Sequence, residues 1–104
     1  MTQEQFERKM ISAGKGFIAC SVVPIINYKK HGNEKILYDE IKKNFKNNIK
    51  TFPQRIAWVT EIIDANKHIE ALKIIEKSHR VGNNFCDLAR KSLQDLSYQN
   101  KTQS

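Results

Sequence analysis

Apolar residues recur at helical spacing along most of the chain, most regularly from Leu37 to Ile49, where one falls at every fourth position. This spacing places side chains on one face of an α-helix. Because Asn33 can cap its first turn, the pattern predicts a continuous helix over residues 33–50. At about 100° per residue, the lysines of this segment fall roughly opposite the apolar stripe. They are Lys35, Lys42, Lys43, Lys46 and Lys50.

The N-terminal part of the chain predicts two further helices. Thr2 followed three residues later by Gln5 is the pattern of a capping box and indicates a short opening helix. Residues 16–26 are apolar, so their pattern alone fits either a buried helix or a strand. Pro24 argues against a central strand. We therefore interpret this segment as a buried helix that ends near Pro24, with a loop through residue 32.

The second half of the chain also has a helical period. Pro53 is tolerated in a first helical turn, and the apolar pattern after it continues to about residue 79. This stretch is either one long helix or two helices with a kink near residues 64–66. Asn83 or Asn84 can then cap a final helix.

Length and composition indicate one all-α domain. The 104 residues suffice for a single modest core, and 39% of them are hydrophobic. With only four Gly and two Pro to interrupt the chain, long helices are the natural outcome. We expect a bundle of four to five helices over residues 1–98, followed by a frayed polar tail over residues 99–104.

The positive charge is concentrated in one region. The whole chain carries a net charge of +7, and residues 29–60 hold eight Lys and Arg against three Asp and Glu. Five of these cations, from Lys42 to Arg55, follow one another without an intervening acid. Such a localised field indicates a surface that binds phosphates or an acidic protein.

Residues 69–96 resemble a helix-turn-helix, in a form too general to name a family. In this motif a short turn presents the second helix to the major groove of DNA. If Phe85, Ala89 and Leu96 face inward, the outer face carries side chains that can bond base edges, although Asp87 there would need a cytosine or a neighbouring cation. The same pattern also fits a helix face that is only solvated. The candidate residues at this end are Arg80, Asn84, Arg90, Lys91 and Gln94.

The chain carries no recognisable catalytic or metal-binding motif. His31, His68 and His79 are not spaced as metal ligands on one helix face. Cys20 and Cys86 are far apart in sequence, and such a pair in a lysine-rich chain without a secretion signal is typical of a reduced, cytoplasmic protein. We expect neither an enzyme nor a cofactor.

Two functions of different classes fit these observations. The first is binding of nucleic acid, DNA rather than RNA, through the lysines, Arg55 and the C-terminal helix. The second is a phage or mobile-element adaptor or inhibitor that binds an acidic or nucleic-acid-binding surface of another protein. A membrane role is disfavoured because the apolar stripe is needed for the core. Homodimerisation stays open.

Overall fold

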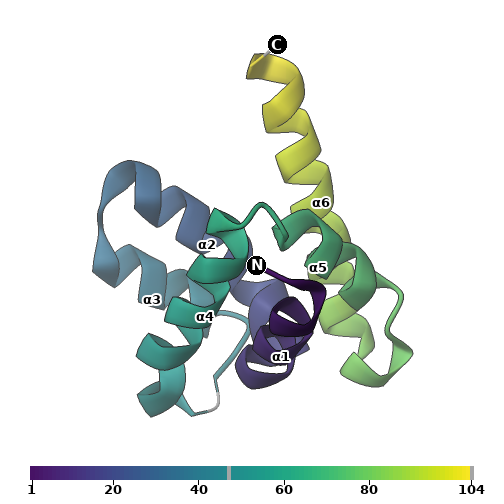
Figure 1. The fold of residues 1–104 in the computed structure, drawn as a ribbon. Coiled ribbons are helices and arrows are strands. Elements are labelled where there is room, and N and C mark those ends of the chain that lie inside the picture. The colour runs from purple at the N-terminus through teal and green to yellow at the C-terminus, as the bar shows by residue number, and fades with distance from the viewer. Residues whose placement is uncertain (47, 104) are drawn as a thin grey trace.

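The helix at the centre of the molecule is α2, which covers Lys15–His31. In this computed structural model α2 packs against every other α-helix, and Figure 1 shows those helices arranged around it. Residues 17–22 of α2 are all buried. The structure describes residues 1–46 and 48–103, without the side chains of residue 79 and of residues 98–103.

The described residues form an all-α fold, as the sequence predicts. Six α-helices are present where four to five were expected, and the radius of gyration, 12.8 Å, is that of a compact single domain of this length. Besides α2 these are α1 (Gln3–Ala13), α3 (Glu34–Lys42), α4 (Phe52–Asp64), α5 (His68–Glu76) and α6 (Asn83–Gln103), with two 3₁₀ turns, η1 (Ile49–Thr51) and η2 (His79–Val81).

Local signals placed several helix ends correctly. The capping box at Thr2 is complete: the Gln5 N–H donates to Thr2 Oγ1 (3.2 Å), and the Thr2 N–H donates to Gln5 Oε1 (3.0 Å). Asn33 caps α3, since its Oδ1 accepts a bond from the Ile36 N–H (3.1 Å). Pro53 lies in the first turn of α4. Thr2 and Asn33 each accept a bond from a backbone N–H that the helix itself leaves unpaired, whereas Pro53 has no N–H that needs a partner.

The stretch after Pro53 is two helices rather than one. It breaks between Asp64 and His68, where Asn66 adopts a left-handed conformation (φ 63°). Asparagine tolerates this conformation better than most residues. The expected kink is therefore a full turn between α4 and α5.

The prediction that the second helix ends near Pro24 is wrong. Helix α2 continues through Pro24 to His31 and ends at Gly32, whose φ of 72° is left-handed. A proline inside a helix costs about 3 kcal/mol. Burial of Ile25 and partial burial of Ile26, which follow the proline, offset part of this cost.

The continuous helix over residues 33–50 is also wrong. Helix α3 ends at Lys42, and the chain turns before the 3₁₀ turn η1. The apolar period continues past the helix because Phe45 still reaches the core from the turn. Asn48 is left-handed (φ 56°), which no α-helix accommodates. Lys46 and Lys50 consequently lie outside any α-helix.

An aromatic cluster joins the segments around α2. The Phe17 ring lies 5.5 Å from that of Phe45 and 5.3 Å from that of Phe52, centroid to centroid, in edge-to-face geometry. Phe85, at the start of α6, lies 6.2 Å from Phe45. These contacts hold the α3–α4 connection and the first turn of α6 against the same core.

Helix α6 runs past the rest of the bundle at its C-terminal end (Figure 1). Its backbone is helical to Gln103, and the side chains of the expected frayed tail lie outside those described, so fraying over residues 99–104 stays a prediction. Within the described chain no single helix has the length and apolarity to cross a bilayer. Only α1 and α2 taken together reach that threshold, and they are bent by 97°.

Candidate nucleic-acid interface

Two of the predicted basic regions meet at a groove of about 390 Å³. Lys43 and Asn44, from the turn after α3, line one side of it. Asn84 and Lys91, from the first turns of α6, line the other side. Lys43, predicted to contact phosphate, therefore shares one surface with Asn84 and Lys91, predicted to contact bases, although more than forty positions separate it from them in sequence.

The aromatic cluster fixes both walls of this groove. Phe45 anchors the turn that carries Lys43, and Phe85 anchors the turn that carries Asn84. Both rings are partly buried against the core, and Phe85 also forms part of the groove lining. Packing of these two rings thus helps to hold both walls in place.

The two lysines of the groove differ in their partners. Lys43 Nζ lies 2.9 Å from Glu40 Oε1, and this hydrogen bond raises the pKa of the Lys43 ammonium. Lys91 forms no ion pair with the side chains that the structure describes. A phosphate would therefore bind Lys91 without displacing a carboxylate, whereas Lys43 would share its charge between phosphate and Glu40.

The remaining lysines of the predicted helix do not form a single face. Lys42 lies on the last turn of α3 and is partly buried, whereas Lys46 and Lys50 are exposed on the connection to α4. These three cations flank the groove-lining residues Lys43 and Asn44 in sequence. Lys35 is exposed on the first turn of α3 and does not line the groove.

Arg55 is turned toward the aromatic cluster. Its guanidinium carbon lies 5.4 Å from the centroid of Phe45 and 5.7 Å from that of Phe17, so it forms cation–π contacts with both rings. The side chain is partly buried. Arg55 thus stabilises the packing beneath the basic connection, and its availability for phosphate is reduced.

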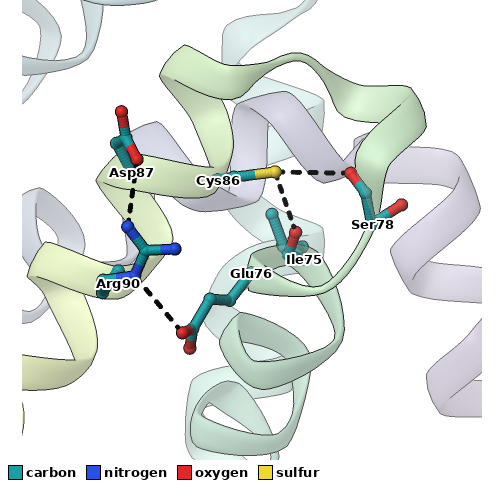
Figure 2. Close-up of polar contacts among 6 residues, drawn as sticks. All are labelled: Ile75, Glu76, Ser78, Cys86, Asp87 and Arg90. Atoms are coloured by element: carbon teal, nitrogen blue, oxygen red, sulfur yellow. Dashed lines mark hydrogen bonds and ion pairs between the residues drawn. The ribbon is translucent and has the colours of Figure 1, made fainter.

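The C-terminal helix pair has a longer turn than the motif it resembles. Helices α5 and α6 pack together, as expected. Residues 77–82 join them, whereas DNA-binding helix-turn-helix motifs use a turn of about three to four residues. Figure 2 shows the hydrogen bonds that connect the two ends of this turn: the Cys86 thiol is shared between the carbonyls of Ile75 (3.5 Å from Sγ) and Ser78 (3.3 Å). Arg80 is exposed in η2.

The predicted outer face of α6 is exposed, and the predicted inner face is buried or partly buried. Arg90 is engaged on the side of α5: its Nε lies 3.4 Å from Glu76 Oε1, and its Nη1 lies 3.2 Å from Asp87 Oδ1 (Figure 2). Asp87 therefore faces a neighbouring cation, one of the two partners expected for it. Gln94 is exposed one turn further along.

Sequence reasoning missed the part that Asn44 and Leu88 play in the groove. Both line it. Asn44 falls within the expected helix, where a polar residue beside the lysines carries no distinct signal, and the helical period of α6 places Leu88 on its apolar side. Only the packing of the α3 turn beside α6 gives either residue its place.

Buried titratable groups lie apart from this groove. Burial raises the pKa of the Cys20 thiol to about 12, and burial lowers the pKa of His68. Cys20 and Cys86 are both free and buried. Among the described side chains, no three His, Cys, Asp or Glu residues cluster as ligands for a metal ion.

Comparisons with known proteins add no relative. No family model matches the sequence, and neither the curated proteins nor the solved structures return a significant match.

Proposed function

We propose that this protein binds nucleic acid, DNA in preference to RNA, through the groove between the α3 turn and α6 together with the lysines beside it. The observation that supports this most directly is the convergence of Lys43 and Lys91 on one groove. Lys46 and Lys50 are exposed on the adjoining connection. Four ammonium groups on neighbouring segments can follow a phosphate backbone, and each contact releases condensed counterions.

Base contacts would come from the same edge of α6. Asn84 lines the groove and Gln94 is exposed on that helix, and carboxamides bond adenine through paired donor and acceptor groups. Lys91 can contact either a phosphate or a guanine. Arg90 would first have to release Glu76 and Asp87, so we expect it to contribute less than Lys91.

The proposal predicts a steep salt dependence. Four phosphate contacts give an affinity that falls about 100-fold between 50 and 200 mM salt. Fluorescence anisotropy with a labelled 20-base-pair duplex, repeated with an RNA hairpin of equal length, measures this directly. DNA is expected to bind more tightly than the hairpin.

Charge-matched variants separate a defined surface from general attraction. Lys91→Glu and Lys46→Glu are expected to weaken duplex binding about tenfold and to reduce the salt slope. Lys73→Glu makes the same charge change on the exposed side of α5, outside this groove, and is expected to weaken binding less than threefold. Equal losses for Lys91→Glu and Lys73→Glu, or binding that all three variants retain, would show that no such surface exists.

A second candidate function, binding of another protein, is favoured by a different observation. Tyr28 and Ile36 are exposed beside a pocket of about 440 Å³ at the α2–α3 corner. Nucleic-acid binding gives these apolar side chains no role. With either function we propose a cytoplasmic location, which the two free cysteines support.

A further inference from the structure

The groove lined by Lys43 and Lys91, here called the basic groove, is one end of a longer furrow. A pocket of about 220 Å³ adjoins it and shares its lining residues Asn44, Leu88 and Lys91. The pocket at the α2–α3 corner adjoins this middle pocket in turn, since Pro24 and Glu40 line both. The three hollows therefore adjoin one another. Helices α2 and α3 line the middle pocket and the α2–α3 pocket, whereas α6 lines the middle pocket and the basic groove.

The furrow has the length of a short extended peptide. The middle pocket and the α2–α3 pocket together follow α2 from Ala19 to His31. At about 1.5 Å per residue this distance is roughly 18 Å. An extended chain advances about 3.3 Å per residue, so five to six residues span this distance.

The floor and walls offer groups that match a peptide backbone. Carboxamides occur at three points along the furrow, at Asn27, Asn44 and Asn84. Each carries both a donor and an acceptor, as a peptide unit does.

The far end of the furrow combines apolar and polar side chains. Tyr28 and Ile36 both line the α2–α3 pocket, and their exposed fractions are 37% and 56%. The other lining residues are apolar at Pro24 and Leu37 and polar at Asn27, His31, Asn33 and Glu40. An apolar side chain placed against Tyr28 and Ile36 would remove two exposed hydrophobic residues from water, which favours binding.

The charges favour a peptide over a second nucleic acid strand or a second copy of this chain. Glu40, Asp87 and Asp95 line the furrow against only two lysines, so a row of phosphates along its length would meet carboxylates. The chain's net charge of +7 opposes self-association. Lys91, which has no described carboxylate partner, attracts a single acidic residue at the end of the furrow that meets the basic groove.

We propose that this furrow binds an extended segment of a partner protein, five to six residues long. The segment carries an apolar side chain at the Tyr28–Ile36 end and an acidic residue at the Lys91 end. Backbone bonds to the asparagines provide affinity, and the two ends provide specificity. This site goes beyond the proposed nucleic-acid surface, which it shares only at the basic groove.

The test uses selection from a random heptapeptide phage library on the intact protein, followed by titration of the enriched peptides by ¹⁵N NMR. We expect enriched peptides to combine one large apolar residue with Asp or Glu four to five positions away. Shifts should concentrate at Asn27, Ile36, Asn44 and Lys91. The double variant Tyr28→Ser/Ile36→Ser is expected to lose at least tenfold in peptide affinity. Because both side chains are exposed, the variant should fold.

Controls keep this proposal separate from the nucleic-acid surface. Ile11→Ser removes an apolar side chain that is 81% exposed on α1, and it should leave peptide affinity unchanged. Lys46→Glu should weaken DNA binding without affecting the peptide, and Tyr28→Ser/Ile36→Ser should do the reverse. Loss of DNA binding in the double variant would assign the furrow to nucleic acid and overturn the proposal.

Two further results would also overturn it. One is a selection that enriches no peptide, or peptides that bind the double variant as well as the parent. The other is a dimer in sedimentation measurements that Ile36→Ser converts to a monomer, because a second copy of the chain would then be the occupant.

Discussion

Phe85 lies directly against Gly16: ring carbons Cδ2, Cε2 and Cζ stand 3.1–3.2 Å from the position that a β-carbon on Gly16 would occupy. This contact lets α6 approach the first turns of α2. It also sets where Phe85, and with it Asn84 and the groove, lies relative to the α3 turn.

Gly16→Ala is expected to destabilise the protein by about 1 kcal/mol. Alanine gains about 1 kcal/mol of helix propensity, but overpacking costs roughly 1–3 kcal/mol, and Phe45 restricts any retreat of the Phe85 ring. Urea denaturation measures the change. In a Phe85→Leu background the same substitution should become stabilising. A stabilising effect in the parent protein would show that the ring moves freely.

The Cys20 thiol is expected to resist modification and to make stability fall at alkaline pH. Its folded pKa, about 12, lies above the unfolded value of 9.0, so only the unfolded chain loses the proton between these limits. Stability therefore declines as pH rises above about 9. Between pH 8 and pH 10, Cys20 should contribute a loss of about 1 kcal/mol that Cys20→Ser lacks. Identical pH profiles for the two proteins would contradict this.

His68 is expected to make the fold sensitive to mild acid. Its Nδ1 is buried without a hydrogen-bond partner among the described atoms, and burial lowers its pKa below the ordinary 6.5. The folded protein thus keeps the imidazole neutral while the unfolded chain binds a proton, so stability is lost as pH falls below 6.5. His68→Gln should flatten thermal stability between pH 7 and 5. His31→Asn, at an exposed histidine, serves as the control, and an equal flattening there would refute the assignment.

Arg90 is expected to couple α5 to α6 weakly. Its two ion pairs are exposed to solvent, and such pairs contribute about 0–1 kcal/mol. A double-mutant cycle of Arg90→Ala with Glu76→Ala should give a coupling energy in that range, reduced by high salt. Gln94→Ala, one turn away on the same helix, should show no coupling to Glu76. Equal coupling at both positions would mean that the cycle reports helix propensity instead.

Several elements were predictable because their causes are local. Thr2 and Asn33 cap helices by accepting bonds from backbone N–H groups three residues later, so sequence spacing suffices to find them. The inner face of α6 also followed from its period. Local signals failed at two helix ends. Helix α2 continues past Pro24 because residues after the proline are buried, and α3 ends at Lys42 although Phe45 still packs against the core.

The sequence alone was enough to predict an all-helical chain, the start of most of its helices and a surplus of positive charge between residues 29 and 60. Which cations share a surface depends on tertiary packing. Lys43 and Lys91 meet because Phe45 and Phe85 pack against one core, while Arg55 turns onto the aromatic rings. Helical periodicity specifies which face of a helix is apolar, whereas the neighbour of its polar face depends on contacts between residues distant in sequence.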